Sequence, residues 1–410
     1  MMQCRHCNHE LQHPFLDLGS APPSNAYLSK DGLSEPEVWF PLRVLVCNHC
    51  WLVQTEDHAG REALFSKDYA YFSSFSSSWL VHSKRYVETM ATRFGLNEKS
   101  CVVEIAANDG YMLQYVQAQK IPCYGIEPTA STAAAARAKG ICIEEEFFGV
   151  TLADRLVAQG RQADLTAANN VLAHVPDIND FVGGFARLLK PQGVATFEFP
   201  HLLRMVTENQ FDTAYHEHYS YLSLHAVRTV FEANGLTIFD VEELPTHGGS
   251  LRVFAQRLDS GLHKCEPAVD RILSQEKTAG LLSTALYAEF MRQPARISRE
   301  LLSFLIKAAN EGKTIGAYGA AAKGNTLLNF AGVRPHLLPY VVDLNPAKQG
   351  KYMPGSQIPI VDEAHLRSHR PDYVLILPWN LREEVMQQLS YIREWGGVFV
   401  TAIPSLKVVA

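Results

Sequence analysis

Short apolar runs alternate with helical patterns through the middle of the chain. Five runs have the length and apolar content of buried strands, at residues 101–106, 123–127, 141–144, 164–168 and 194–199. Between them, apolar side chains recur at helical spacing, at residues 111–119, 129–139, 150–158 and 178–189. This alternation predicts a parallel sheet with helices on both faces.

The end of this region has a different pattern. Residues 237–244 and 251–258 predict two strands, and His247-Gly-Gly249 predicts the turn between them. Five strand–helix steps closed by such a hairpin are typical of a class I methyltransferase. We therefore expect an α/β fold with a doubly wound sheet at the centre of the chain.

The flanking regions predict two further domains. Residues 1–62 have the pattern of short strands and turns. After a helical stretch at 266–311, a second strand–helix alternation follows, with strands at residues 314–318, 339–343, 372–377 and 397–401. Its length is short for a full dinucleotide-binding fold. The expected domains are a small N-terminal one, a methyltransferase domain and a Rossmann-like one, at residues 1–62, 63–265 and 266–410.

Composition narrows the functional class. The chain has 410 residues and a formal net charge of −6, without runs of lysine or arginine, which argues against nucleic acid as a partner. It has no signal peptide and no apolar run of membrane length, so we expect a cytoplasmic protein that uses no membrane. The sequence leaves the oligomeric state open, with a monomer as the working expectation.

Four cysteines near the start of the chain predict a metal site. Cys4 and Cys7 form one C-x-x-C pair, and Cys47 and Cys50 form another. The alternatives are disulfides or a redox pair, but thiols in the cytoplasm are expected to be reduced. Two such pairs supply the four thiolates of a tetrahedral Zn²⁺ site, which leaves no open position for water. We therefore expect a structural zinc ion in the domain at residues 1–62.

The loop after the first strand of the central domain predicts a site for S-adenosyl-L-methionine (SAM). Class I methyltransferases usually carry E-x-G-x-G-x-G there, and Glu104, Ala106, Asn108 and Gly110 occupy those places. Gly110 allows close backbone approach, and asparagine tolerates a left-handed backbone better than most residues. Glu127 ends the second strand, where a carboxylate can accept from both ribose hydroxyls. The alternative for Glu127 is a solvated carboxylate at a strand end.

Candidate chemical groups follow the fourth and fifth strands and the later turn. They are Asn170, His174, Tyr215, Glu217, His218 and His247. Because ligands of open α/β sheets bind outside the carboxyl ends of the strands, we expect these residues to face one cleft. Histidine is the usual general acid or base near neutral pH, and Glu217 could orient an imidazole. His216 competes with His218 as the base.

The C-terminal domain contains a rival motif. Residues 319–324 are close to G-x-G-x-x-G, and Asp343 follows at the distance of a dinucleotide fingerprint. An NAD-dependent oxidoreductase is therefore an alternative enzyme class. In another interpretation, Lys323 and the loop N–H groups face the diphosphate of a sugar nucleotide. A third interpretation, suggested by Ala106, is a sugar-nucleotide binding module with a degenerate SAM site.

Taken together, the motifs resemble the sugar 3-C-methyltransferases of deoxysugar biosynthesis. The resemblance rests on the two cysteine pairs, Tyr69-x-Tyr71-x-Ser-Ser, Glu104-Ile-x-x-Asn-Asp-Gly110, Asn170-x-Leu-x-His174-x-Pro, Phe211-Asp-x-x-Tyr215-x-Glu217-His218, His247-Gly-Gly249 and Tyr318-Gly-Ala-x-Ala-Lys323. It covers essentially the whole chain in order. Members of that family bind SAM in the middle domain and a nucleotide-linked 4-keto sugar between domains. They are thought to remove the C3 proton and methylate the enolate.

The resemblance also implies roles for single residues. His218 resembles the base, and Tyr215, Glu217, His174 and Tyr71 resemble the residues around the sugar ketone. Asn170 is assigned to the SAM site, and Tyr71, His174, His247 and Lys323 to substrate binding. The sequence departs from the family loop at Ala106, where glycine is commoner. An O- or N-methyltransferase for another small molecule stays open, and the sugar, its nucleotide and the stereochemistry are not determined.

Overall fold

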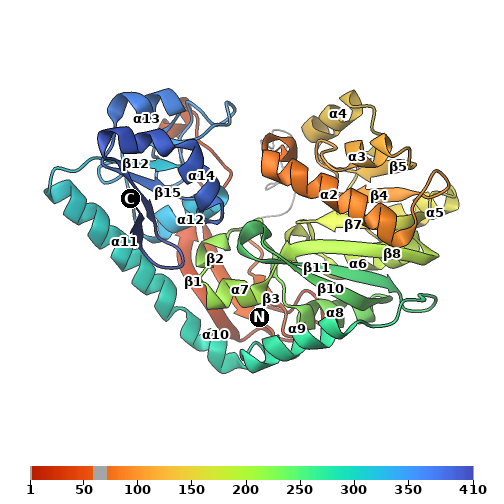
Figure 1. The fold of residues 1–410 in the computed structure, drawn as a ribbon. Helices are drawn as coiled ribbons and strands as arrows, with labels where there is room; N and C mark the ends of the chain where they lie inside the picture. The colour runs from red at the N-terminus through yellow and green to blue at the C-terminus, as the bar shows by residue number, and fades with distance from the viewer. Residues whose placement is uncertain (1, 59–71, 410) are drawn as a thin grey trace.

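The computed structural model describes residues 2–58 and 72–409, which form three sheets (Figure 1). A four-stranded N-terminal sheet lies beside a central seven-stranded sheet and a C-terminal six-stranded sheet. Within these described ranges, every helix is too short or too polar to cross a lipid bilayer.

The N-terminal sheet takes its last strand from the central region of the chain. Its antiparallel strands run in the order β1-β2-β3-β9, with bounds His13–Ala21, Phe40–Val46, Val53–Thr55 and Ser220–Tyr221. The four predicted zinc ligands lie before β1 and between β2 and β3. Since β9 directly follows the predicted catalytic segment, the zinc-binding domain is joined to the predicted site through β3.

The central sheet has the expected strand–helix order. Its parallel strands are β4, β5, β6, β7 and β8, at Val102–Ile105, Cys123–Ile126, Ile143–Glu144, Ala163–Asn169 and Leu189–Pro200. The hairpin β10 (Leu236–Leu244) and β11 (Ser250–Arg257) closes the sheet, with β11 antiparallel to both β10 and β8. In chain order the strands are arranged 3-2-1-4-5-7-6, with the predicted turn at His247 between the last two.

Helices cover both faces of this sheet. Alternate residues of β4 show how, because Val102 packs with one helix layer and Val103 with the other. The first layer contains α2, α3 and α4, at Ser77–Phe94, Leu113–Ala118 and Ala130–Ala138. The second contains α5, α6 and α8, at Val150–Ala158, Ile178–Leu188 and Leu224–Ala233. The short helix α7 (Leu202–Thr207) follows β8.

Three helices lead to the C-terminal domain. They are α9, α10 and α11, at Pro267–Thr278, Thr284–Phe290 and Arg292–Asn310, and they run beneath and beside the other domains (Figure 1). The N-terminal sheet packs against α10, where Phe15 meets Tyr287 and Phe290 at ring-centroid distances of 5.3 and 4.7 Å. The N-terminal and C-terminal domains therefore share one apolar core.

The C-terminal sheet has six strands, whereas the sequence pattern predicted four. Its strands β12 to β17 are Ile315–Tyr318, Val341–Val342, Ile360–Val361, Tyr373–Ile376, Val398–Thr401 and Lys407–Val409. They lie in the order 3-2-1-4-5-6 of a Rossmann fold, with the last strand antiparallel. Helices α12, α13 and α14 span Ala322–Phe330, Glu363–His369 and Arg382–Gln388. The domain stays small because the β13–β14 link, residues 343–359, contains no helix.

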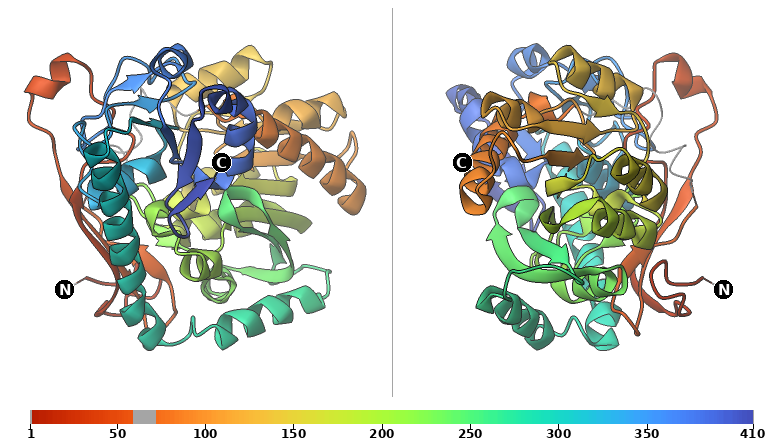
Figure 2. Two further views of the ribbon diagram at one scale, coloured as in Figure 1. Left: turned by 60° about the vertical axis from the view of Figure 1, so that its left-hand side comes forward. Right: turned by 90° about the vertical axis from the view of Figure 1, so that its right-hand side faces the viewer.

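Figure 2 shows how the three domains lie relative to one another. The N-terminal strands run along one side, and the central and C-terminal α/β domains lie next to each other. Hydrogen bonds join these two domains directly, since Trp379 Nε1 donates to Asp212 Oδ2 at 2.8 Å and Thr326 Oγ1 donates to the Ala214 carbonyl at 2.8 Å. Both acceptors belong to the segment between β8 and β9, so the C-terminal domain borders the predicted catalytic residues.

Candidate active site

The four predicted zinc ligands converge. Their sulfur atoms lie within 4.8 Å of one another, with Cys4 and Cys50 at 3.5 Å and Cys7 and Cys47 at 3.6 Å. Four thiolates at the usual Zn–S distance would be about 3.8 Å apart, so this arrangement fits a tetrahedral Zn²⁺. Gln54 Nε2 donates to Cys4 Sγ at 3.2 Å and favours the thiolate. The site is structural, because all four positions belong to the protein.

The loop after β4 has the path expected for a SAM loop without its usual glycines. Ala106, Asn108 and Gly110 all have positive φ, at 59°, 49° and 76°. A β-carbon at Gly110 would lie 2.2 Å from the Ile141 side chain, so glycine is required there by space as well as by φ. Asn108 is further fixed by Ser73, whose backbone N–H donates to Asn108 Oδ1 at 2.9 Å.

Glu127 lies at the end of β5 and faces this loop. Its Oε2 accepts from Asn108 N and its Oε1 from Thr129 N, both at 2.9 Å. Burial raises the pKa of Glu127, and these two backbone N–H groups act in the opposite direction. The Glu127 carboxylate is thus held in one orientation beside the loop. Glu104, the other predicted carboxylate of the SAM site, is buried within β4.

The same edge of the sheet carries polar atoms that need a partner. Asn169 ends β7 and Asn170 follows it, and the Oδ1 atoms of both are buried without a hydrogen bond in the described part of the chain. Asn170 also has a positive φ of 54°. Because buried polar atoms are nearly always hydrogen-bonded, these atoms fit a site that a polar cofactor completes. The residues present therefore fit SAM.

His218, Tyr215 and His174 form one compact cluster. The rings of His174 and His218 lie 4.6 Å apart, and those of Tyr215 and His218 lie 3.9 Å apart. His218 Nδ1 lies 2.8 Å from the Thr213 carbonyl, and His174 Nδ1 lies 2.9 Å from the Glu217 carbonyl. A carbonyl oxygen only accepts, so both Nδ1 atoms carry the proton and both Nε2 atoms carry the basic lone pair. The Tyr215 hydroxyl lies 2.6 Å from His218 Nε2 and donates to it.

These imidazoles are neutral near physiological pH. Burial lowers the pKa of His218 well below its usual value, and His174 adds to the effect. Burial also lowers the pKa of His174 and that of His247 to about 4. A neutral imidazole is in the protonation state that a general base requires, although the lowered pKa makes it a weaker base.

His216 faces the other way. Its Nε2 lies 3.3 Å from the Phe40 carbonyl and 3.2 Å from the Pro41 carbonyl, at the start of β2. His218 is therefore the imidazole of this segment that meets Tyr215 and His174.

Glu217 has a partner that the sequence did not indicate. Its side chain is 2% exposed, and its Oε2 accepts from Asn25 Nδ2 at 2.5 Å. Burial raises the pKa of Glu217 to about 7, against the hydrogen bonds from Asn25. It is the main-chain carbonyl of Glu217, rather than its carboxylate, that orients the imidazole of His174.

His247 joins the predicted SAM edge to this cluster. Its Nε2 lies 3.1 Å from Asn170 Nδ2, and its φ of 54° is unusual for a residue other than glycine. Glu198, which is fully buried, supports the turn, because its Oε1 accepts from Thr246 at 2.9 Å. Burial opposes ionisation of Glu198, yet the hydrogen bond from His82 and the charge of Arg252 hold its pKa below the usual value.

Lys323 brings a positive charge from the C-terminal domain. Its Nζ donates to Asn380 Oδ1 at 2.8 Å and lies 4.6 Å from the Trp379 ring centroid. Burial lowers its pKa, whereas Asp212 raises it. Lys323 also disfavours protonation of His218 and His247, so it lies close enough to the cluster to affect both electrostatically.

The dinucleotide-like motif of the C-terminal domain, residues 319–324 with Asp343, bonds to other parts of the chain. Asp343 Oδ2 accepts from Ala320 N and Oδ1 from Asn345 N, both at 2.8 Å, and Lys348 Nζ lies 3.7 Å from Oδ2. The Tyr27 hydroxyl, from the N-terminal domain, donates to the Ala320 carbonyl at 2.6 Å. The Asp343 carboxylate, which in a dinucleotide fold would bind the ribose, is therefore already bonded to two backbone N–H groups and lies close to Lys348.

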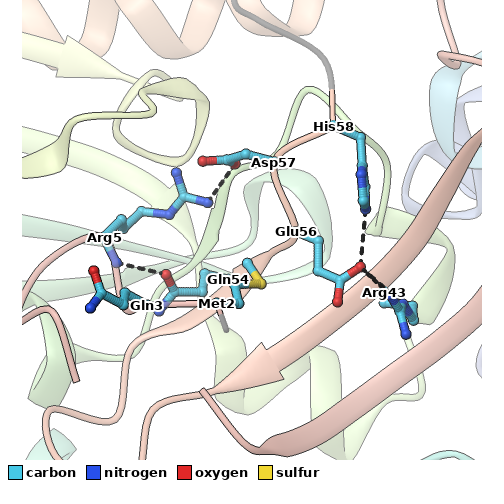
Figure 3. Close-up of a pocket in the computed structure, with 8 residues that line it drawn as sticks. All are labelled: Met2, Gln3, Arg5, Arg43, Gln54, Glu56, Asp57 and His58. Carbon is cyan, nitrogen blue, oxygen red and sulfur yellow. Dashed lines mark hydrogen bonds and ion pairs between the residues drawn. The ribbon is translucent and has the colours of Figure 1, made fainter. Parts of the chain in front are cut away.

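A separate pocket on the N-terminal domain has a volume of about 310 Å³ (Figure 3). Its charged groups pair with one another, Arg5 with Asp57 at 2.9 Å and Arg43 with Glu56 at 2.7 Å. The pocket contains none of the predicted catalytic or SAM-site residues. Tyr71, which was predicted to border the sugar, lies outside the described residues.

Comparisons with known families agree with the three-part organisation. Residues 4–65 match a family described as "Putative zinc binding domain", residues 82–241 match a methyltransferase domain, and residues 245–404 match a C-methyltransferase C-terminal domain. The C-methyltransferase NovU of Streptomyces niveus is 32% identical over 408 residues, which cover 100% of this chain and 97% of NovU.

Solved structures resemble parts of the chain. The magnesium protoporphyrin IX methyltransferase ChlM of Synechocystis, with bound S-adenosylhomocysteine, is 15% identical with a TM-score of 0.34. The match covers 43% of this chain and 83% of ChlM. A SAM-dependent methyltransferase of Mesorhizobium loti is 16% identical with a TM-score of 0.32, over 42% of this chain and 98% of that one.

Proposed function

This chain belongs to the C-methyltransferase family and is a SAM-dependent methyltransferase, and from that premise we propose that it methylates C3 of a nucleotide-linked 4-keto deoxysugar. The observation that carries the proposal is the cluster of His218, Tyr215 and His174 between the SAM-binding edge and Lys323. A neutral base at the boundary of two domains suits the removal of a proton from carbon.

The base is proposed to be the pair of His218 and Tyr215. The C3–H bond breaks, its proton moves to His218 Nε2 directly or through the Tyr215 hydroxyl, and the electron pair forms the enolate. The Thr213 carbonyl stabilises the resulting imidazolium through Nδ1, as the orienting group does in other acid–base sites. SAM, when bound, supplies the electrophilic methyl group that the enolate carbon attacks.

The enolate also needs stabilisation at its oxygen. Both Nε2 atoms of His218 and His174 are acceptors, so hydroxyl or ammonium groups must provide this stabilisation. Lys323 supplies positive charge at the cluster, and the same position suits a sugar-nucleotide diphosphate near the start of α12. Glu104, Ala106, Asn108, Gly110, Glu127 and Asn170 are proposed to hold SAM so that its methyl group lies near C3.

The NAD-dependent alternative is less well supported. A dinucleotide in the C-terminal domain would compete with Tyr27 and Lys348 for the place beside Asp343. Reorganising this interface between domains would be part of the cost of binding, so we do not propose a dehydrogenase.

The test is a screen of SAM consumption against nucleotide-linked 4-keto deoxysugars, with 4-hydroxy analogues as controls. Only the ketone acidifies the C3 proton, so we expect turnover with the keto sugars and none with the alcohols. Exchange of the C3 proton into deuterated water should occur without SAM. Methyl transfer to oxygen or nitrogen, seen by mass spectrometry and NMR of the product, would contradict C3 methylation.

A further inference from the structure

A turn-containing segment of the N-terminal domain packs against the proposed active site. Residues 22–28 follow β1 and reach both the catalytic segment and the C-terminal domain. Asn25 bonds Glu217, Tyr27 bonds the Ala320 carbonyl, and Leu28 pairs with Tyr352 through two backbone hydrogen bonds of 3.0 and 2.9 Å. One short segment of the zinc-binding domain thus contacts the two domains that border the proposed substrate site.

The contact between Asn25 and Glu217 is close and largely shielded from water. Asn25 Nδ2 lies 2.5 Å from Glu217 Oε2, although 192 positions separate the residues in the chain. Glu217 is 2% exposed, so water contributes little to the solvation of its carboxylate. A hydrogen bond to a shielded carboxylate favours the charged form and fixes its direction.

We propose that Asn25 is a positioning residue of the active site, which holds the Glu217 carboxylate ionised and directed at the substrate. This inference rests on the proposed function, since Glu217 would contact the keto sugar in the way that the resemblance to the sugar 3-C-methyltransferases implies. Asn25 itself acts through Glu217 and need not touch the substrate.

The groups around Glu217 explain why the Asn25 amide should have a large effect on the pKa of Glu217. Burial alone raises the pKa of Glu217 towards neutrality, and both influences that oppose it come from Asn25, through its side chain and its backbone. His174 bonds the Glu217 main chain, and His218, the next residue, is neutral. Tyr27 is a further titratable neighbour, and Lys348, Asp343 and Glu217 all affect its phenol electrostatically.

The first test is the pH dependence of kcat in Asn25→Ala and in Asn25→Asp. The wild-type rate should fall as the pH drops below about 7, because Glu217 then becomes protonated. We call this fall of kcat at low pH the acid limb. Asn25→Ala removes the hydrogen-bond donor to Glu217, so the midpoint of the acid limb should move to a pH about one unit higher. Asn25→Asp keeps the size of the side chain but places two carboxyl groups together, and should move the limb further.

Recovery at alkaline pH separates positioning from a structural defect. At pH 9 the carboxylate of Asn25→Ala is ionised again, so kcat should return to within about threefold of wild type. At pH 6 the loss should be about tenfold, the consequence of a one-unit shift. Zinc content and SAM affinity should match wild type in each variant. A uniform loss at every pH, or an unshifted limb in both variants, would overturn the proposal.

Two further variants locate the effect. Tyr27→Phe keeps the ring but removes the hydroxyl, which bonds the Ala320 carbonyl at 2.6 Å and lies 3.4 Å from Asn25 Oδ1. Its acid limb should shift less than that of Asn25→Ala, because the Asn25 donor to Glu217 remains. Glu217→Gln should abolish the limb, and adding Asn25→Ala to it should change kcat little, since the group through which Asn25 acts is gone. Equal effects of Asn25→Ala with and without Glu217→Gln would show that Asn25 does not act through Glu217.

A ligand-free measurement keeps this inference distinct from the proposed function. If no keto sugar is turned over by wild type, the proposed function fails and the kinetic test cannot be made. The titration of Glu217 can then be followed by NMR of ¹³C-glutamate-labelled protein, with its signal assigned from the loss in Glu217→Gln. A midpoint that is higher in Asn25→Ala than in wild type supports the inference, and an unchanged midpoint overturns it.

Discussion

At the scale of single residues, the proposed SAM site is expected to depend on Glu127. Its carboxylate is oriented by two backbone N–H groups at the end of β5. We expect Glu127→Ala to weaken SAM binding by about 1.5–3 kcal/mol, the range for a hydrogen bond to a charged group, or roughly 10–150-fold. Isothermal calorimetry measures this. Glu144→Gln, at the end of the next strand and paired with Arg161, is the matched control and should bind SAM normally. Unchanged affinity in Glu127→Ala would remove it from the site.

His218 and His216 provide the sharpest pair of variants for the chemical step. His218→Asn should lower kcat and the rate of C3 proton exchange by about 10²–10⁴, the usual range for general-base catalysis. SAM binding should be retained. His216→Asn should exchange at close to the wild-type rate, because that ring faces the main chain of β2. If His218→Asn exchanges as fast as wild type, the base is another group, with His174 the next to test.

At the scale of elements, the turn at His247 is held against the C-terminal domain. Gly248 has a φ of 88°, and a β-carbon there would lie 2.5 Å from the Trp379 ring. Gly248→Ala should therefore lower both stability and kcat, since Trp379 or the turn must move. The positive φ alone costs a residue with a β-carbon roughly 1–2 kcal/mol.

Gly332→Ala isolates the effect of the clash. Gly332 has a similar φ of 69°, but a β-carbon there meets nothing within 4 Å. The Gly332→Ala variant should therefore lose only the stability that the positive φ costs, and its kcat should stay at the wild-type value. Thermal unfolding and steady-state kinetics of both variants give the comparison. Equal kcat in the two variants would show that contact with Trp379 does not matter for catalysis.

At the scale of the whole molecule, the zinc site should support catalysis from a distance. Thr55, at the end of β3, donates through Oγ1 to the His218 carbonyl at 2.9 Å, and β3 pairs with β9. Loss of zinc from the two cysteine knuckles, which lie before β1 and between β2 and β3, should loosen this sheet and displace His218. We expect Cys4→Ser to lose zinc, to lower the rate of C3 proton exchange and to keep SAM affinity, because the SAM site lies in a different sheet.

Metal analysis, proton exchange and SAM calorimetry test this expectation. Cys265→Ser, at an exposed cysteine outside the cluster, is the control and should hold one zinc ion per chain. Full exchange activity in zinc-free protein would show that the knuckles do not support the active site.

Local patterns in the sequence were enough to predict the order of the elements in the central sheet and the cluster of four cysteines. Apolar periodicity predicted the strand–helix alternation of the central sheet, since each strand and helix buries a face set by its own spacing. The two C-x-x-C pairs predicted the metal cluster, because each pair brings two sulfurs together within one turn. His174 and His218 each follow a strand, which predicted that both lie at the same edge of the sheet, since parallel strands end on the same side.

Contacts between distant segments were decided by packing. The sequence offered His216 and His218 as alternatives, and the main chain of β2 turned one of them away. Strand β9 joined the N-terminal sheet, so a domain predicted to be separate became part of the support of the active site. Asn25 carries no signal of its own in the sequence, because a single amide has a role only once folding places it against Glu217. Such pairings depend on which apolar faces pack together, and no local period encodes that choice.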